Sequence, residues 1–308
     1  MLEMSMDLSK PVKLSGISLA APFMNGAYIG SKSVDDIEKL AKSASGAVVV
    51  GSISVKPRKA NPGQGYWIHK ERFYSLNSYG MPNGGLAYFK KNLPLMVKLA
   101  HTQNKPLIAN VIGFSKEEFL TLVGLVQESG ADMVELNFGC PNVWDAGKQK
   151  QIVSYSPSLV KEILGYIASN KPKIKISVKI SPLPPDILRD VSKEIVASGI
   201  VQAITATNSY PNASITTGTG GVKGQRITLA GLAGRSLKPI SVGVVRQLKE
   251  MLPKRIEIIG CGGISSTNDV NDYLEAGAKA VQIATALVDD GLSVFDKILF
   301  QSSKSQAQ

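Results

Sequence analysis

The sequence of 308 residues predicts an α/β protein, a (β/α)8 TIM barrel built as a single domain with long βα loops over its C-terminal face. Two observations favour this fold: eight short apolar runs alternate with amphipathic stretches, and no linker or repeat divides them. Strands that alternate with helices indicate a parallel sheet, and chains of this length often form one α/β barrel. We expect one domain over residues 1–308, with a loose tail at about 301–308.

The apolar runs are mostly continuous and rich in Val and Ile, which is typical of parallel strands buried on both faces. They lie at residues 22–27, 47–54, 106–112, 133–138, 174–180, 203–208, 256–261 and 280–284. An open doubly wound sheet is the alternative arrangement. The barrel is favoured because residues 287–308, after the last run, leave room for one closing helix and the tail.

The stretches between these runs have helical periodicity and predict helices at residues 34–43, 116–129, 158–167, 185–198 and 242–251. Ser115 precedes one of them in a capping-box arrangement, and Gly130 and Gly199 follow two others. Residues 56–85 and 209–235 are too long for plain connections. Long βα loops of a barrel gather over the C-terminal face, where barrels hold their chemistry.

The composition suits a globular chain, with 44% hydrophobic and 19% charged residues. No run reaches eighteen apolar residues, so a membrane span is not expected. Two widely spaced cysteines make no disulfide framework, which favours a cytoplasmic setting. The net charge of +11 suits a nucleic acid, an anionic ligand or a basic surface. The lysines are scattered, so a nucleic-acid partner is not expected.

Polar residues follow or interrupt several predicted strands. Asn110 stands in the third, Asn137 at the end of the fourth and Lys179 within the fifth, while Asn208 and Ser209 end the sixth. These positions converge on the catalytic face of a barrel. A lysine inside an apolar strand needs an anionic partner, because burial penalises its charge. That partner is a reduced flavin, a Schiff base or a carboxylate on a neighbouring strand.

Cys140 follows the fourth strand between Gly139 and Pro141. Inert packing is common for free cysteines, but a rigid turn between two asparagines, Asn137 and Asn142, favours a reactive thiolate that acts as base or nucleophile. The two histidines lie outside the strand ends, and no metal-ligand spacing occurs, so no metal is expected.

Two further groups predict a ligand. Gly262 and Gly263 expose backbone N–H groups after the seventh strand, and Thr285 holds the matching place after the eighth. This arrangement suits a phosphate, although a tight turn is the alternative. The amides of Asn77, Asn137, Asn142 and Asn208 would form an uncharged cage suited to a small ligand rich in carbonyl and N–H groups, such as a pyrimidine.

Along nearly its whole length the chain resembles the class 1, cysteine-based dihydroorotate dehydrogenases. The matching segments are PFMN at 22–25, NP at 61–62, NSYGMPN at 77–83, NVIG at 110–113, ELNFGCPN at 135–142, VK at 178–179, TNS at 207–209, GLAG at 231–234, IGCGGI at 259–264 and QIATAL at 282–287. The resemblance implies an FMN enzyme of pyrimidine biosynthesis that oxidises dihydroorotate to orotate. Cys140 would remove the C5 proton while a hydride passes from C6 to flavin N5.

The resemblance also implies the remaining site residues. Lys179 would stabilise negative charge on the reduced flavin. The substrate would be held by Asn77, Gly80, Met81, Asn137, Asn142, Asn208 and Ser209. FMN would be bound by Ala27, Ser52, Asn110, Asn137, Lys179, Gly234, Gly262, Gly263, Ala284 and Thr285. A homodimer is implied, and the electron acceptor stays open among fumarate, a quinone and NAD reached through a separate electron-transfer subunit.

Two positions depart from the family pattern. Gly51 stands where the family has a lysine, with Lys56 or Arg58 as candidates to reach in from the next loop, and Tyr79 replaces a smaller residue. A reductase of another pyrimidine therefore remains an alternative. A tRNA-dihydrouridine synthase is a second alternative, because the positive net charge suits a tRNA substrate. Enzymes of that family, however, resemble a barrel followed by a helical domain. A barrel that binds a ligand without catalysing a reaction is the third alternative.

Overall fold

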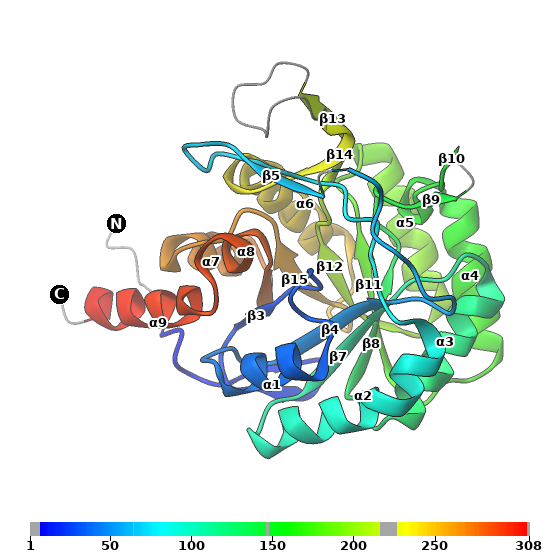
Figure 1. The fold of residues 1–308 in the computed structure, drawn as a ribbon, viewed down its shortest axis with the longest axis horizontal. Helices are drawn as coiled ribbons and strands as arrows, with labels where there is room; N and C mark the ends of the chain where they lie inside the picture. Colours follow the sequence, from blue (N-terminus) through cyan, green and yellow to red (C-terminus); the bar gives the residue numbers. More distant parts are fainter. Residues whose placement is uncertain (1–6, 64, 146–147, 216–226, 307–308) are drawn as a thin grey trace.

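Eight parallel strands form the centre of the protein. The computed structural model describes residues 7–63, 65–145, 148–215 and 227–306. Hydrogen-bonded neighbours run in the order β3 (Phe23–Asn25), β16 (Ala280–Ile283), β15 (Glu257–Cys261), β12 (Val201–Ala206), β11 (Lys175–Ile180), β8 (Met133–Asn137), β7 (Leu107–Val111) and β4 (Val48–Ile53). Each strand overlaps one of the eight apolar runs, and helices surround them (Figure 1). The predicted barrel is confirmed.

The helices follow the strands along the chain. They are α1 (Val34–Lys42), α2 (Gly85–Thr102), α3 (Lys116–Glu128), α4 (Pro157–Ser169), α5 (Pro185–Ser198), α6 (Lys238–Met251), α7 (Thr267–Glu275), α8 (Thr285–Asp290) and α9 (Ser293–Gln306), with 3-10 turns η1 (Val153–Tyr155) and η2 (Arg235–Leu237). The five expected helices are confirmed within a few residues. None of the described helices has the length and apolar character needed to cross a membrane.

The expected loose tail at 301–308 is wrong for its first part, because α9 continues to Gln306. Gln301 accepts hydrogen bonds from the backbone N–H and the hydroxyl of Thr267, at 3.3 and 3.4 Å. The buried Ser302 hydroxyl accepts a bond from Leu8 N–H at 3.2 Å. These contacts tie the last helix to α7 and to the N-terminal segment.

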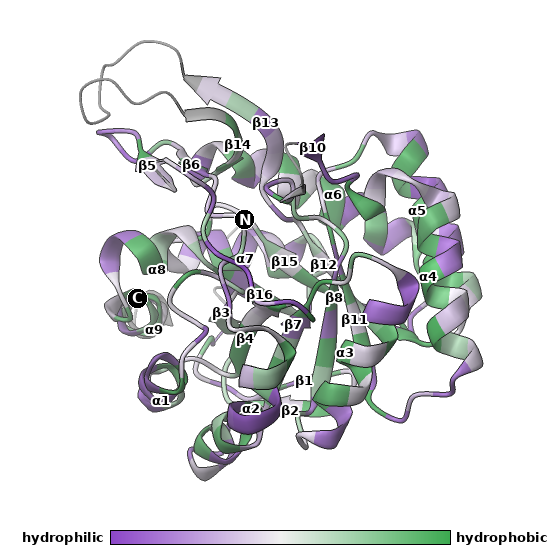
Figure 2. Ribbon diagram, turned by 45° about the vertical axis from the view of Figure 1, so that its right-hand side comes forward, coloured by the Kyte–Doolittle hydropathy of each residue, from purple (hydrophilic) through white to green (hydrophobic). Residues whose placement is uncertain are grey.

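The two long loops pair with each other. They form an antiparallel sheet in the order β13 (Tyr210–Ile215), β14 (Ile227–Ala233), β6 (Ser75–Asn77) and β5 (Tyr66–Ile68). This sheet and the short hairpin of β1 (Val12–Leu14) and β2 (Ile17–Leu19) lie at opposite sides of the barrel (Figure 2). Another hairpin joins β9 (Trp144–Asp145) to β10 (Lys148–Gln149).

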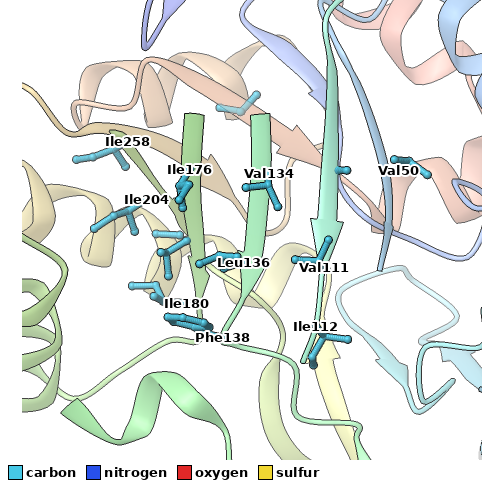
Figure 3. Packing of buried hydrophobic residues seen from close by; sticks show 14 of the residues in the cluster. Val50, Val111, Ile112, Val134, Leu136, Phe138, Ile176, Ile180, Ile204 and Ile258 are labelled. Atoms are coloured by element: carbon cyan, nitrogen blue, oxygen red, sulfur yellow. The ribbon is translucent and has the colours of Figure 1, made fainter. Parts of the chain in front are cut away.

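Side chains alternate along each strand between the barrel interior and the helices. Outward residues such as Val134, Leu136 and Ile176 form the main core beneath the helices (Figure 3). Inward residues form layers. The lowest layer is apolar and includes Val49, Ile108, Met133, Ala203 and Ile259, which pack on Leu14 and Leu19 of the hairpin. Above it the interior becomes polar, with Glu135 and then Lys179 fully or nearly buried.

The barrel closes between β3 and β4 through a side chain. The fully buried Asn25 amide accepts from Val49 N–H at 3.0 Å and donates to Val49 C=O at 2.6 Å, as a neighbouring strand would. Gly46 N–H donates to Phe23 C=O at 2.8 Å. A Cβ at Gly46 would lie 2.0 Å from Ala21 O, so only glycine permits this approach.

Asn25→Ala should lower the free energy of unfolding by about 2–4 kcal/mol, because it leaves the N–H and C=O of Val49 buried without partners. Urea denaturation measures the effect. Asn92→Ala is the matched control: it removes a side-chain bond to Tyr88 O within α2 and should change stability by less than about 0.5 kcal/mol. Equal losses in the two variants would contradict this role for Asn25.

Candidate active site

A hollow of about 830 Å³ opens at the carboxyl ends of the barrel strands. Many of the residues selected from sequence line it: Ala27, Asn77, Lys179, Asn208, Ser209, Gly262, Gly263, Ala284 and Thr285. Gly234 lines a smaller hollow beside it, together with Gly263 and Thr285. The strand order therefore brings side chains from β11, β12, β15 and β16 to one site, as expected for a barrel.

Lys179 lies at the floor of this hollow and is 5% exposed. Its ammonium donates to Gln282 Oε1 at 2.7 Å. Burial opposes the charge, but the negative charges of Cys261 and Glu135 raise the pKa of Lys179 above its ordinary value. Burial also raises the pKa of the Cys261 thiol, and Glu135 is the acidic side chain on a neighbouring strand that acts on Lys179. A carboxyl group on a neighbouring strand, one of the three partners considered for Lys179, is thus present.

Asn137 links the other asparagines. Its Nδ2 donates to Ser52 Oγ at 3.1 Å and to Asn110 Oδ1 at 3.3 Å, and its Oδ1 accepts from Asn208 Nδ2 at 3.2 Å. Ser52 and Asn110 thereby lie beside the hollow without lining it. Asn137 and Asn208, two of the four amides expected to form a cage, are therefore hydrogen-bonded to each other.

Asn142 and Asn77 form a second pair, with Asn142 Nδ2 donating to Asn77 Oδ1 at 2.5 Å. Asn77 Nδ2 donates to Gly231 O at 3.1 Å, across the β14–β6 ladder. Asn142 Oδ1 is buried and accepts no hydrogen bond from the residues that the structure describes. An unpaired buried acceptor costs free energy unless a ligand N–H or a water supplies a donor, so this atom fits a ligand that carries N–H groups.

Gly80 and Met81 lie in the loop that faces this pair. Gly80 O accepts from Arg58 Nε at 3.2 Å, and Met81 O accepts from Asn83 Nδ2 at 2.9 Å. A Cβ on Gly80 would lie 2.3 Å from Asn61 Oδ1, and its φ is +71°. This close approach explains why a glycine stands there.

Cys140 is half-buried beyond β8, in the turn that Asn137 and Asn142 bracket. Desolvation raises the pKa of its thiol, and a backbone hydrogen bond from Asn142 acts against that rise. The positive charges of Lys32, Arg58 and Lys150 act in the same direction as this bond and favour the thiolate. Sequence reasoning missed Lys32 and Lys150, since their neighbourhood to Cys140 exists only in the folded chain.

These three cations bond to main-chain oxygens. Lys32 Nζ donates to Pro82 O at 2.8 Å, Arg58 Nη2 to Trp144 O at 3.1 Å, and Lys150 Nζ to Gly113 O. Arg58 and Lys150 also lie over the Phe114 ring, 5.0 and 4.3 Å from its centre. Burial lowers the pKa of Lys32 and of Lys150 to about 8.

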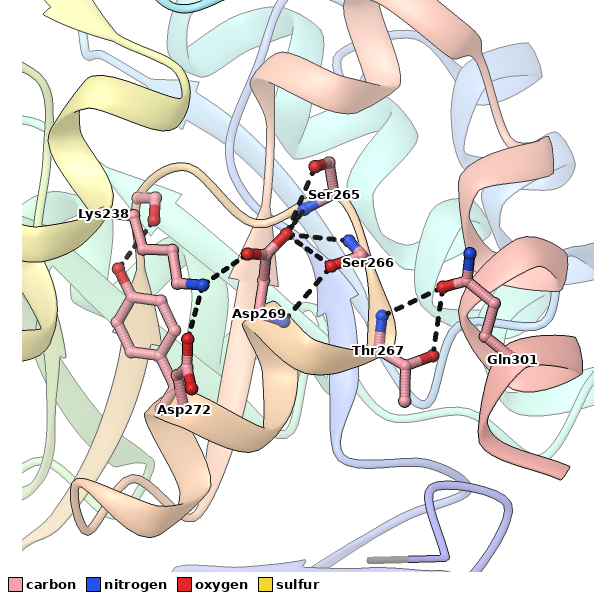
Figure 4. A network of polar contacts seen from close by, with 9 residues as sticks. Lys238, Ser265, Ser266, Thr267, Asp269, Asp272 and Gln301 are labelled. Atoms are coloured by element: carbon pink, nitrogen blue, oxygen red, sulfur yellow. Dashed lines mark hydrogen bonds and ion pairs between the residues drawn. The ribbon is translucent and has the colours of Figure 1, made fainter. Parts of the chain in front are cut away.

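The turn after β15 is held by a polar network below it (Figure 4). Ser266 caps α7, and Asp269 Oδ2 accepts from the N–H groups of Ser265 and Ser266 at 2.9 Å each. Lys238 Nζ lies 2.5 Å from Asp269 Oδ1. Although burial opposes ionisation, these bonds hold the pKa of Asp269 below its ordinary value. Gly262 and Gly263, with φ of +134° and +67°, are thereby presented to the hollow on a fixed turn.

The backbone at Gly51, where the resemblance led us to expect a lysine, excludes a side chain. Its φ is +129°, and a Cβ would lie 2.3 Å from Asn110 O. No lysine side chain fits this backbone. Lys56 is exposed, whereas Arg58 reaches the Gly80 loop beside Cys140. Tyr79, the second departure, lines the hollow and stacks on Tyr66 with ring centres 6.2 Å apart.

The fold and the site define a barrel enzyme with a ligand pocket at the carboxyl ends of its strands. The family model described as Dihydroorotate dehydrogenase matches residues 10–303. The chain therefore belongs to the dihydroorotate dehydrogenase family and is an oxidoreductase.

Individual relatives agree with this assignment. The chain is 30% identical to "Dihydroorotate dehydrogenase B (NAD(+)), catalytic subunit" of Thermoplasma volcanium, over 94% of this chain and 90% of that one. It is also 30% identical to "Dihydroorotate dehydrogenase A (fumarate)" of Lactococcus lactis subsp. cremoris, over 91% and 88% of the two chains. The crystal structure of DHODH from Eimeria tenella in complex with ferulenol shares the fold, with a TM-score of 0.81 and 20% identity over 99% of this chain and 86% of that one.

Gly51→Ala and Gly51→Lys should each lower the free energy of unfolding by at least about 2 kcal/mol. The strain of a non-glycine residue at a positive φ adds to the steric clash of its Cβ. Chemical denaturation measures the loss. Gly124→Ala is the matched control, since a Cβ at this α3 position meets no atom within 4 Å and should be neutral or stabilising by up to about 1 kcal/mol. A Gly51→Lys variant as stable as the parent would contradict the steric explanation.

Proposed function

We propose that the chain is a single FMN-binding domain that oxidises dihydroorotate to orotate in pyrimidine biosynthesis, with Cys140 as the base. The observation that carries the proposal is the chain of amides from the Cys140 turn to the Lys179 hollow, with the unpaired Asn142 Oδ1 beside it. Dihydroorotate has N–H donors and carbonyl acceptors that match such amides. Family membership supports the same substrate.

The residues present fit FMN. The hollow has glycines at one end and a buried cation at the other. Backbone N–H groups on the Gly262–Gly263 turn suit a phosphate, and Lys179 suits negative charge on a flavin ring. Gly234, Ala284 and Thr285 would complete the phosphate end, and Ala27, Ser52, Asn110 and Asn137 would border the ring. When bound, FMN supplies the acceptor for the hydride that leaves C6 of the substrate.

The chain's own residues perform the other half of the reaction. Asn77, Asn137, Asn142, Asn208 and Ser209, with the backbone of Gly80 and Met81, would orient the pyrimidine. The Cys140 thiolate takes the C5 proton, and the C5–C6 double bond forms as the hydride leaves. The cations around Cys140 stabilise the thiolate that this step requires.

The electron acceptor differs between the two relatives, whose names specify NAD(+) and fumarate, and both are 30% identical to this chain. With two cysteines in its sequence, the chain cannot supply the four thiolates of a typical iron–sulfur cluster. Transfer to NAD would therefore need a separate electron-transfer subunit. We propose a cytoplasmic homodimer on the basis of family membership.

Anaerobic addition of dihydroorotate should bleach the flavin absorbance of the holoprotein. Cys140→Ala should retain FMN but slow bleaching by at least about 100-fold, as expected for loss of a general base. Ser192→Ala, which truncates a buried hydroxyl on α5, is the control and should bleach normally. Bleaching by another dihydropyrimidine but not by dihydroorotate would overturn the substrate, and unchanged bleaching in Cys140→Ala would overturn the base.

The bleaching rate should rise with pH, because the pKa of Cys140 is raised and only its thiolate accepts the proton. Lys32→Met removes a cation that is charged below about pH 8, which raises the pKa of Cys140 further. The pH–rate profile should shift to higher pH, with the largest rate loss near pH 7. Lys91→Met, at an exposed position of α2, should leave the profile in place. A shift to lower pH would contradict the electrostatic role of Lys32.

A further inference from the structure

The polar layer inside the barrel is organised around one carboxylate. Glu135 on β8 is fully buried and accepts three hydrogen bonds. Oε1 accepts from Asn110 Nδ2 at 2.6 Å, while Oε2 accepts from Thr205 Oγ1 at 2.5 Å and Gln282 Nε2 at 2.8 Å. The donors come from β7, β12 and β16, so Glu135 connects strands on different sides of the barrel.

Gln282 separates two buried charges. Its Oε1 accepts from Lys179 Nζ at 2.7 Å, and its Nε2 donates to Glu135. An ammonium group only donates and a carboxylate only accepts, so this amide has a single permitted orientation. In the described part of the chain Lys179 forms no ion pair within 4.0 Å; the charge of Glu135 acts on it over a longer distance, and Gln282 links the two groups by hydrogen bonds.

Asn110 extends the same order of donors and acceptors from Glu135 toward Asn137. Because Nδ2 donates to Glu135, its Oδ1 faces Asn137 and accepts from Asn137 Nδ2 at 3.3 Å. Asn137 Oδ1 is then turned toward Asn208 Nδ2 at 3.2 Å and Gly139 N–H at 3.3 Å, next to Cys140. The orientation of each amide follows from the one before it.

We propose that Glu135 is a positioning residue that fixes both the placement of Lys179 and the orientation of the Asn110 and Asn137 amides. The proposal rests on the proposed function, because Lys179 and Asn137 are the groups assigned there to the flavin and the pyrimidine. Glu135 itself lies one layer below them and lines no part of the hollow. A carboxylate is required because its oxygens accept from all three donors and donate to none.

Glu135→Gln has nearly the same shape but introduces a donor. If its NH2 group faces Asn110, the Asn110 and Asn137 amides must turn to avoid opposed donors. If it faces Gln282, that amide must turn its own NH2 group toward the Lys179 ammonium. Either change disturbs one of the two ligand-binding groups, and a buried group left without its partner carries a substantial penalty.

Exchanging the amide of Asn110 and the carboxylate of Glu135 should restore the pattern of hydrogen-bond donors and acceptors. In Asn110→Asp/Glu135→Gln, the new Gln amide donates to the new Asp, whose other oxygen still accepts from Asn137 Nδ2. The Gln oxygen still accepts from Thr205 and Gln282, and the net charge is unchanged. Asn110→Asp alone places a second carboxylate against that of Glu135. This variant should therefore weaken orotate binding as Glu135→Gln does.

The experiment measures FMN affinity by fluorescence quenching and orotate affinity by perturbation of the flavin spectrum. Glu135→Gln and Asn110→Asp should each weaken orotate binding by at least about tenfold, equivalent to losing one charged hydrogen bond. The double variant should bind orotate at least about fivefold more tightly than either single variant, because the exchange restores the donor and acceptor at each contact. Ser177→Ala truncates a buried hydroxyl of the same barrel interior that donates a long hydrogen bond to Val134 O at 3.5 Å, and this variant should bind normally.

Orotate binding at the parent level in Glu135→Gln, or a double variant no better than the singles, would overturn the role of Glu135. If the single variants fail to fold, recovery of a folded, ligand-binding double variant supports it, and an unfolded double variant overturns it. If the parent protein binds neither FMN nor orotate, the proposed function has failed. The role of Glu135 is then decided by the free energies of unfolding of the parent, the two single variants and the double variant, all without ligand. A double variant more stable than either single variant supports the role of Glu135, and one that is no more stable overturns it.

Discussion

Closure of eight parallel strands into a barrel is the constraint on which the site depends. Closure directs every second side chain into a narrow interior that water does not fill, so each polar group there needs a partner within the protein. The lower interior meets this demand with apolar packing between Val49, Ile108 and Met133. The upper interior meets it with hydrogen bonds that converge on Glu135.

The same constraint links the chemistry of the site to its stability. Lys179 keeps its charge although it is buried, because a carboxylate lies in the layer below it and an oriented amide accepts its hydrogen bond. Cys140, at the rim, has a different environment: desolvation opposes its thiolate, and three cations from separate loops offset part of that effect. The two ends of the proposed reaction are therefore controlled by different parts of the chain, the base by loops and the electron-accepting side by strands.

Glycines determine how closely these parts approach. Gly46 allows the close approach through which the barrel closes between β3 and β4, and Gly51 allows β4 to pack directly on Asn110 O. The backbone at position 51 leaves no room for a lysine side chain, and the positive charges near Cys140 come from Lys32, Arg58 and Lys150.

The sequence alone determined the barrel, the strand ends that carry function, and Cys140, Lys179 and the asparagines as the residues to consider, because periodicity and turn residues are local properties. It also contained an unused signal for Glu135, a charged residue inside an apolar strand by the same argument as Lys179. Only the tertiary structure decided that Glu135, Gln282 and Asn110 share one network, that Lys32 and Lys150 act on Cys140, and that α9 extends through the expected tail. The hydrogen bond between Gln282 and Glu135, for example, joins residues 147 positions apart, and no local pattern encodes which distant side chain becomes a hydrogen-bond partner.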